Sequence, residues 1–418
     1  MATRNKRPIR AQRVDECESL GDVFENSLPA FGGRSLRKVY EILDEAIGLG
    51  CPLTLAIAGP VTLSGQHYSW LLPLLESGWV AYVSTTDAVC YHDGHRSLGG
   101  HLEDPIFEVP IAGHDGALRD EKIIRVTDVG FDEAVLYDQD RFLSACLQLP
   151  EFQRKMTGTE LRYRIGRYYS ALETRNNVPE GLLSCCHRMA IPVLVGAPGD
   201  GSLFLNSMKL WAMREAGLVT RYDFDLDVHA EVFESCAYHR WGLLENPVGK
   251  LAALILGGGV PKNYSLQPEP ALSQVLGQIQ ITGYDFDVQI VSPPVSDGSL
   301  SSCEPCEAVT WGKVKKETYP IATASLQADY STVMPFVVKA LLDNRKRYSK
   351  MTREIGATAA YEREPMASGY LRPLAGYRLY EHRERLCSKL KEDLRQKREW
   401  LLASLLYDFD VGRLVEAM

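Results

Sequence analysis

Residues 307–313, Glu-Ala-Val-Thr-Trp-Gly-Lys, have the most chemically suggestive spacing in the chain. Lys313 directly follows a small hinge residue, two positions after Trp311 and six after the carboxylate of Glu307. Burial against an aromatic ring lowers the pKa of a lysine, so that part of it is neutral and can attack an imine or an aldehyde. A nearby carboxylate can hold a cationic amine substrate. From these seven residues alone, a strand end with a core tryptophan and a solvated lysine is the preferred interpretation, because lysines are mostly exposed. An imine-forming lysine is the alternative, and the rest of the chain favours it.

Two glycine-containing turns could bring backbone close to a ligand. Asp200-Gly201-Ser202 lies between a predicted strand and a predicted helix over residues 203–215, whose first N–H groups can bind phosphate. Asp200 can instead bind ribose hydroxyls or cap the helix. The triple glycine 257–259 after another strand is a signal of the same kind. Neither the G-x-G-x-x-G fingerprint nor a Walker lysine is present, so the standard Rossmann and P-loop motifs are absent from the sequence.

Short apolar runs alternate with helix-like segments, such as residues 34–49, along most of the chain. This alternation predicts βαβ units, a mostly parallel central sheet and helices on both faces. Each predicted strand ends in small or polar residues, and open α/β sheets bind ligands at those carboxyl ends. The predicted strands are residues 53–58, 80–84, 191–196, 251–256, 287–291 and 321–326.

The segments flanking this pattern differ in composition. Residues 1–30 are polar and are predicted to form an N-terminal arm, and residues 94–160 are predicted to be an insertion or surface excursion. The main domain is assigned to residues 31–345 and a charged helical extension to residues 346–418. Within the extension, leucines at helical spacing predict either a partner-binding helix or a helix that packs on its own subunit, and the second is preferred. These leucines are Leu386, Leu390, Leu394, Leu401 and Leu405.

Composition limits the classes of function. The chain has 418 residues and a formal net charge of −8, which argues against nucleic-acid binding and suits cationic small molecules. Its ten cysteines show no small-domain disulfide framework, which favours a reducing cytoplasm. The basic N-terminus is followed by no apolar signal region, and no apolar stretch is long enough to cross a bilayer. We therefore expect a soluble cytoplasmic protein without a membrane partner.

Two further clusters contain ligand-type residues. Residues 90–95, Cys-Tyr-His-Asp-Gly-His, resemble part of a metal site, but no second cluster at zinc spacing accompanies them, so we expect no metal. Cys303 and Cys306 form a lone C-x-x-C that could be redox-active or half of a zinc site. Nothing thioredoxin-like surrounds the pair, which favours ordinary loop cysteines.

Taken together, the order and spacing of these motifs resemble the deoxyhypusine synthase family over roughly residues 35–345, most strongly from Gly199 onward. The resemblance implies a Rossmann-like α/β fold and NAD as cofactor. It also implies a homotetramer, and transfer of an aminobutyl-type group from a polyamine to an acceptor amine through an enzyme lysine imine. The matching pieces are Thr85-Thr86, residues 199–203, residues 254–260 with Lys262, residues 297–299, residues 307–313, and residues 328–329 with Ser331 and Pro335.

Residue by residue, the resemblance assigns the imine-forming lysine to Lys313, the substrate-packing tryptophan to Trp311 and the amine-binding glutamate to Glu307. Ser292 stands where the family usually has threonine, which keeps the hydroxyl group. The positions that the resemblance assigns to NAD are Thr85, Thr86, Asp200, Ser202, Gly258, Gly259, Ser292, Asp297, Gly298, Ala328 and Asp329.

The chain departs from the family pattern mainly where the polyamine would bind. Leu205 and Leu300 stand at positions of family aspartates, and Asn263 stands at a substrate-binding histidine. Tyr91 and His92 replace an acidic pair, one member of which contacts the cofactor ribose. Each lost carboxylate removes a charge-assisted hydrogen bond worth roughly 1.5–3 kcal/mol. The sequence therefore predicts retained transfer chemistry on an altered amine.

Two alternatives remain open from the sequence. The acceptor can be a protein lysine, or a free amine as in homospermidine-type synthases. A different class of function is a non-catalytic, NAD-binding partner subunit, which Leu205 and Leu300 favour and the intact Lys313 disfavours. The identities of the donor amine and of the acceptor do not follow from the sequence.

Overall fold

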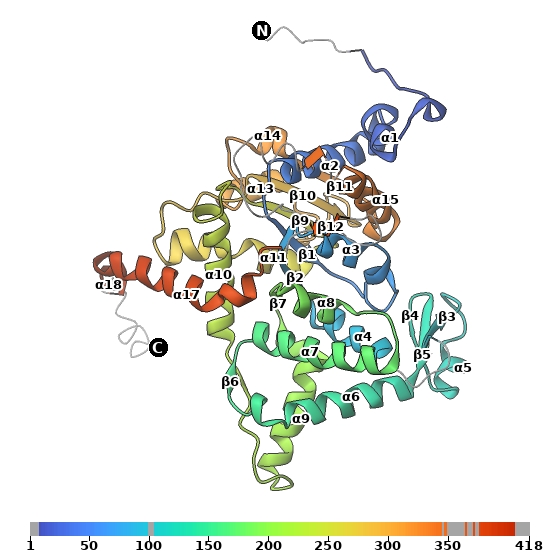
Figure 1. The fold of residues 1–418 in the computed structure, drawn as a ribbon, viewed down its shortest axis with the longest axis vertical. Helices are drawn as coiled ribbons and strands as arrows, with labels where there is room; N and C mark the ends of the chain where they lie inside the picture. The colour runs from blue at the N-terminus through green and yellow to red at the C-terminus, as the bar shows by residue number, and fades with distance from the viewer. Residues whose placement is uncertain are drawn as a thin grey trace, which may run out of the picture.

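The computed structural model describes residues 8–98, 104–344, 347–348, 364–365, 371–372 and 376–405. Its centre is a six-stranded sheet in which every neighbouring pair is parallel, in the order β11-β10-β9-β1-β2-β7 (Figure 1). The predicted parallel sheet is confirmed, including all six strands. Its strands are β1 (Leu53–Ile57), β2 (Val80–Thr85), β7 (Val193–Val195), β9 (Ala252–Leu256), β10 (Phe286–Val291) and β11 (Thr323–Gln327).

The strand boundaries differ from the predicted ones by up to two residues. The last strand begins at Thr323 rather than at residue 321, because Tyr319–Ala322 forms the short helix α14 with a proline near its start. Strand β1 lies in the middle, paired with β9 on one side and β2 on the other, and all five of its residues are buried. A strand covered on both faces reads as a continuous apolar run, which explains why it could be predicted.

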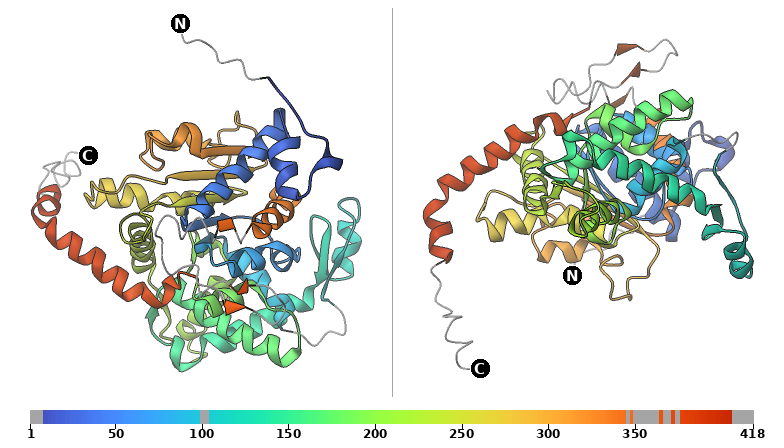
Figure 2. Two further views of the ribbon diagram at one scale, coloured as in Figure 1. Left: turned by 45° about the horizontal axis from the view of Figure 1, so that its top comes forward. Right: turned by 90° about the horizontal axis from the view of Figure 1, so that it is seen from below.

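Helices cover both faces of the sheet, as predicted (Figure 2). Leu53, Leu55 and Ile57 of β1 point into a core that includes helices α2, α3 and α15. Ala56 of the same strand points the other way, into a core that includes α10, α11 and α17. The helices are α2 (Phe31–Gly48), α3 (Leu72–Glu76), α10 (Val228–Leu244), α11 (Gly259–Leu266), α15 (Tyr330–Asp343) and α17 (Leu379–Gln396).

A second group of helices lies beyond β7 and β2, in the lower part of Figure 1. The region predicted as an excursion contributes α6 to this group, and a three-stranded antiparallel sheet, β3-β5-β4, at its side. Its elements are α4 (Asp87–Ser97), β3 (Ile106–Glu108), α5 (Asp115–Asp120), β4 (Ile123–Val126), β5 (Val129–Asp132), α6 (Glu133–Leu147), β6 (Lys155–Met156), α7 (Gly158–Asn176), α8 (Leu182–Met189), α9 (Ser202–Glu215) and β8 (Asp225–Leu226).

Both ends of the chain carry helices. Within residues 8–30, helix α1 (Leu20–Ser27) stacks Phe24 on Tyr40 of α2, with 5.0 Å between ring centroids. At the other end, Leu386 and Leu390 of α17 are buried in the same core as α10, as expected for a helix that packs on its own chain. Helix α18 (Arg398–Leu405) follows. Residues 406–418 of the predicted extension lie outside the described residues.

The remaining α-helices and β-strands of the described residues are α12 (Pro268–Pro270), α13 (Pro305–Thr310), β12 (Glu364–Pro365) and β13 (Leu371–Arg372). Among the residues that the structure describes, no helix is long and apolar enough to cross a membrane.

Candidate active site at the carboxyl edge of the sheet

The strand ends bring most of the predicted cofactor positions to one edge. Thr85 is the last residue of β2, Asp200 and Ser202 follow β7, Gly258 follows β9, and Ser292 follows β10. Asp329 lies just past β11 and begins α15. Because all six strands are parallel, these positions lie along one edge of the sheet, as the sequence predicted.

The glycines after β9 have a backbone that few other residues could adopt. Gly257, Gly258 and Gly259 have φ angles of +89°, +105° and +62°. A Cβ on Gly258 would lie 2.8 Å from the backbone of Ser301. Gly258 is also the N-cap of α11 and provides no side chain to satisfy the first N–H groups of that helix. The triple glycine therefore gives an open backbone turn at the sheet edge.

In the turn after β7, Asp200 does not cap helix α9, which was one of the roles considered for it. Helix α9 is capped from another element, because the Asp87 carboxylate of α4 accepts the Leu203 N–H at 2.9 Å. A Cβ on Gly201 would collide with that same carboxylate, at 2.2 Å from its carbon atoms. Burial raises the pKa of Asp87 to about 6. Asp200 is exposed and caps no helix, so its carboxylate is available to a ligand.

Other predicted cofactor residues have partners within the chain. The Thr85 hydroxyl donates to the Ile57 carbonyl at 2.9 Å and is fully buried, which is a structural role between β2 and β1. Asp297 accepts from the Ser299 N–H and hydroxyl at 3.1 and 2.8 Å, which shapes an exposed turn that includes Gly298. Asp329 caps α15 by accepting the Ser331 N–H at 2.8 Å through one of its two oxygens. Thr86, Ser292 and Ala328 lie beside these residues at the ends of β2, β10 and β11.

Lys313 is placed by a helix end and a strand contact. Helix α13 ends in a Schellman motif, in which the Gly312 N–H donates to the Val309 carbonyl and the Lys313 N–H to the Ala308 carbonyl, both at 3.0 Å. Gly312 has a φ of +71°, so the residue that the sequence suggested as a hinge forms this helix end. The Lys313 carbonyl then accepts the Tyr284 N–H at 2.9 Å. Two sets of backbone hydrogen bonds therefore fix the position of Lys313.

The Lys313 side chain is 8% exposed, and its amine lies 5.8 Å from the centroid of the Trp311 ring. Burial lowers its pKa, and the nearby Cys303 thiol opposes this change. The backbone of Lys313 lies beside Tyr284, at the amino end of β10, rather than at the carboxyl edge. The segment from Ser301 to Cys303 links the carboxyl edge of the sheet to Lys313. Ser301 lies against Gly258 at that edge, and Cys303 lies near the Lys313 amine.

A second buried lysine, Lys262 of α11, lies in the same neighbourhood and was not among the predicted site residues. Its amine donates to the Gln289 side chain at 2.8 Å and to the carbonyls of Cys303 and, at 3.5 Å, Ser301. Burial lowers its pKa, with the negative groups nearby opposing this change. Lys262 accompanies residues 254–260, one of the segments that resemble the family. Its place one helical turn after the triple glycine was the signal that could have identified it.

Asp287 of β10 is the most unusual group beside Lys262. It is buried, and one of its carboxylate oxygens has no hydrogen-bond partner among the described residues. Burial raises the pKa of Asp287 to about 7, and attraction to Lys262 reduces that shift. Nothing in the sequence distinguished this carboxylate from an ordinary exposed residue at the start of a strand.

The predicted departures lie at the surface of the site. Leu205 of α9 is 47% exposed and Leu300 is 39% exposed, and Trp311 is 58% exposed. Glu307 is also exposed, and its charge raises the pKa of the Cys303 thiol in addition to the larger effect of burial. Asn263 is half-buried, one residue after Lys262. In a single chain these side chains face an open surface.

The cluster that suggested a metal has other partners. Asp93 accepts the N–H groups of Leu182 and Leu183 at 2.7 Å and so caps α8. His92 and His95 hydrogen-bond to each other at 2.8 Å. Over the described part of the chain, no group of three or more His, Cys, Asp or Glu side chains could hold a metal ion. The Tyr91 hydroxyl donates to Asp140 of α6 at 2.9 Å. Both replacements in the family's acidic pair, Tyr91 and His92, therefore have a hydrogen-bond partner within the chain.

The C-x-x-C pair lies at the start of α13. Cys303 is half-buried and Cys306 exposed, and both are free thiols. The Cys303 carbonyl accepts from Lys262, so this loop contributes its backbone to the neighbourhood of the two lysines.

The chain is similar to known proteins over most of its length. The family model described as deoxyhypusine synthase matches residues 20–341. A deoxyhypusine synthase-like protein from Nostoc sp. is 31% identical over 379 residues, covering 90% of this chain and 88% of that protein. One from Thermosynechococcus vestitus is 33% identical over 313 residues, covering 73% of this chain and 74% of that protein. A protein from Methanosarcina acetivorans, named a probable deoxyhypusine synthase, is 27% identical and covers 82% of this chain and 96% of its own length. The chain therefore belongs to the deoxyhypusine synthase family.

Proposed function

We propose that the protein is an NAD-dependent transferase that moves an aminoalkyl group from a polyamine-type donor to an acceptor amine through an imine on Lys313. Membership of the family supports an aminobutyl-transferase kind of function. The observation that carries the proposal is Lys313, a buried residue whose amine lies over the Trp311 ring and has a lowered pKa.

The residues at the sheet edge fit NAD. The three positive-φ glycines leave the backbone open beside the uncapped N-terminus of α11, which suits a pyrophosphate. The exposed carboxylate of Asp200 and the unused oxygen of Asp329 can accept hydrogen bonds from ribose hydroxyls. When bound, NAD supplies a hydride acceptor for the donor amine and returns the hydride to the product imine.

Lys313 carries the group between these two redox events. A neutral Lys313 amine attacks the imine carbon of the oxidised donor, forms a new C–N bond and displaces the departing amine, which leaves with a proton. The acceptor amine then attacks the carbon of the Lys313 imine and displaces the lysine in the same way. Low polarity around the amine favours its neutral form, which both steps need.

The substrate would lie on the open side of Trp311 and Glu307. The exposed carboxylate of Glu307 can bind an ammonium group, and the tryptophan ring can cover an alkyl chain. Because Trp311 is 58% exposed, we propose that a homo-oligomer, a tetramer as in the family, covers it. Leu205 and Leu300 make the wall less acidic than in the family, so the donor should carry fewer positive charges than spermidine or hold them differently.

Lys313→Arg tests the proposal. Arginine keeps the positive charge but cannot form the imine, so transfer should fall by about a thousandfold or more. The rise in melting temperature caused by millimolar NAD should remain, because binding of a ligand to the folded state stabilises it. Transfer would be measured by mass spectrometry of products from a panel of diamines, polyamines and guanidino-amines.

Two further variants separate the cofactor from the transfer step. Lys316→Arg is the matched control, since its side chain is 80% exposed three residues away, and it should change neither readout. Asp329→Ala should weaken both the NAD-dependent rise in melting temperature and transfer. Normal transfer by Lys313→Arg, or no effect of NAD on the wild-type protein, would refute the proposal.

A further inference from the structure

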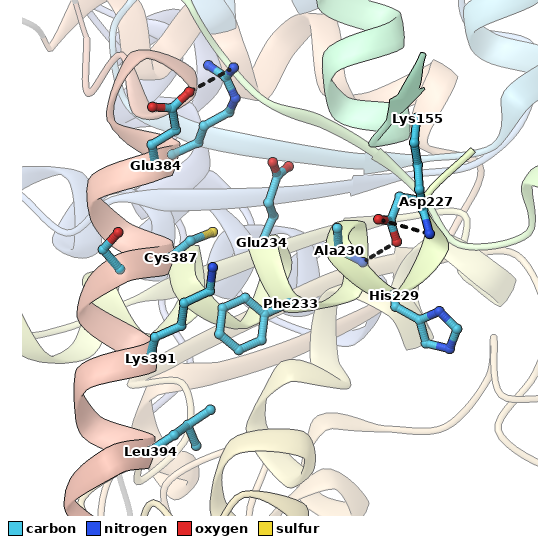
Figure 3. A pocket seen from close by; sticks show the side chains of 12 residues that line it. Lys155, Asp227, His229, Ala230, Phe233, Glu234, Glu384, Cys387, Lys391 and Leu394 are labelled. Carbon is cyan, nitrogen blue, oxygen red and sulfur yellow. Dashed lines mark hydrogen bonds and ion pairs between the residues drawn. The ribbon is translucent and has the colours of Figure 1, made fainter. Parts of the chain in front are cut away.

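A groove of about 750 Å³ lies between helices α10 and α17, with Lys155 of β6 at one end (Figure 3). One wall, α10, belongs to the part of the chain that matches the family model, residues 20–341. The other wall, α17, begins at Leu379, beyond that match. None of the residues that line the groove belongs to α13 or to the strand ends described above, and the groove depends on a segment outside the matched region.

One side of the groove contains a buried carboxylic acid. Glu234 is 7% exposed, and its two oxygens each lie 3.4 Å from the Thr157 hydroxyl, which can donate to only one of them. Burial raises the pKa of Glu234 to about 7. The Thr159 hydroxyl and the charge of Arg383 oppose this shift. The two oxygens of a carboxyl group can accept several hydrogen bonds, so Glu234 retains capacity for N–H groups of a ligand.

Cationic side chains also line the groove, and they would favour an anionic group on the ligand. Lys155 pairs with Asp227 at 3.4 Å and Arg383 pairs with Glu384 at 3.5 Å, so each has a carboxylate partner. Lys391 of α17 lines the same groove, and no described residue forms an ion pair or hydrogen bond with its amine. Lys391 would attract an anion and repel a polyamine.

The body of the ligand would contact apolar side chains. Phe233 of α10 and Leu394 of α17 both line the groove and are half-buried. Figure 3 shows the Phe233 ring and the Glu234 carboxyl group on α10, with Lys391 on the facing helix. An aromatic ring beside a hydrogen-bonding carboxyl group is an arrangement that suits a flat heterocycle with N–H donors.

We propose that this groove binds a purine nucleoside monophosphate, with the base on Phe233, its N–H edge on Glu234 and its phosphate on Lys391. A polyamine would be repelled by the Lys391 cation, and a simple anion would leave the Phe233 ring and the Glu234 carboxyl group without a partner. An amino acid would fill little of a cavity of about 750 Å³, whereas pockets of this size hold ligands as large as nucleotides. The proposal does not depend on the transferase function proposed above.

Calorimetric titration of the full-length protein with GMP and with AMP tests this site. At least one of them should bind at submillimolar concentration, and guanosine, adenosine and ribose 5-phosphate should bind about tenfold or more weakly. Lys391→Glu and Phe233→Ala should each weaken the nucleotide by about tenfold or more. Lys389→Glu is the matched control on α17, since Lys389 is solvent-exposed and pairs with Glu392 at 3.3 Å, and should leave affinity unchanged.

Asp329→Ala distinguishes the groove from the proposed NAD site and should not affect nucleotide affinity. The proposal is overturned if neither nucleotide binds at millimolar concentration, or if Lys391→Glu binds as tightly as the wild type. It is equally overturned if Asp329→Ala, and not Lys391→Glu, removes binding, since the nucleotide would then occupy the strand-end site.

Discussion

Lys262 and Lys313 are both buried lysines in the same neighbourhood, but their amines have different surroundings. Burial lowers the pKa of each. The Lys262 amine donates to one side-chain oxygen and two backbone carbonyls. The Lys313 amine has the Trp311 ring as its described contact, at 5.8 Å.

This comparison teaches that burial alone does not identify a nucleophilic lysine. Hydrogen bonds to acceptors stabilise the ammonium form and occupy its protons, so Lys262 is suited to hold the loop at Ser301 and Cys303 in place. A lysine over an aromatic ring, without such acceptors, can lose its proton and present its lone pair. The difference supports the covalent role proposed for Lys313 and suits Lys262 to an anchoring role.

Asp287→Asn would test whether the Lys262 amine is held by neutral hydrogen-bond acceptors or by an ion pair with Asp287. Among the substitutions considered, it should have the largest effect on the free energy of unfolding. The folded-state pKa of Asp287 is raised to about 7 from 3.8, so its contribution to stability is present at low pH and is lost as pH rises through this window. Asparagine cannot ionise. The variant should therefore gain stability relative to the wild type between pH 4 and pH 8, by about 2–4 kcal/mol.

Urea unfolding at the two pH values would measure this difference. If the wild type instead became more stable relative to the variant as pH rises, Asp287 would be an ionised partner of Lys262. The contrast between the two lysines would then need revision, because Lys262 would be held by an ion pair.

Gly312→Ala would disturb the position of Lys313 without changing the lysine. The φ of +71° is costly for alanine, so we expect a loss of about 1–2 kcal/mol in stability and a fall in the rate of transfer. Gly116→Ala is the control, because a Cβ there meets no atom within 4 Å and φ is not in the left-handed region. Equal effects of the two substitutions on turnover would show that the Schellman motif does not position the amine.

Leu205→Asp would restore a carboxylate on the exposed surface of α9 and should have the smallest effect. Spermidine should become a better substrate, with KM lower by about tenfold, in line with a hydrogen bond to a charged group. Met208→Asp, one turn further along the same helix and 45% exposed, is the matched control. An equal gain from both substitutions would indicate general attraction of cations, and no gain from Leu205→Asp would separate Leu205 from donor binding.

Much of the fold followed from the sequence because five of the six strands of the central sheet are buried along their whole length. All five residues of β1 are apolar or buried, and such runs stand out between amphipathic helices. The strand ends then predicted the edge at which Asp200, Gly258 and Asp329 lie. One boundary that differed was residue 321, where a short helix with a proline replaced the predicted strand start.

The site could be predicted only in part, because long-range contacts decide which polar residues are free. Asp87 caps α9 from a different helix, which leaves Asp200 available, and no local pattern indicates this exchange. Asp287 and Gln289 meet Lys262 only once β10 lies beside β9. The C-terminal helix was predicted from its leucines, whereas the groove that it forms with α10 depends on packing between residues about 150 positions apart in the chain.

The central claim is that Lys313, and not Lys262, carries the alkyl group. Borohydride added to the wild-type protein during turnover with NAD and a substrate amine would reduce an enzyme imine to a stable amine. Peptide mass spectrometry should then find the added alkyl group on the peptide that contains Lys313, and none in the Lys313→Arg variant. An adduct on Lys262 or on another lysine, or continued turnover with no adduct on Lys313, would contradict the account.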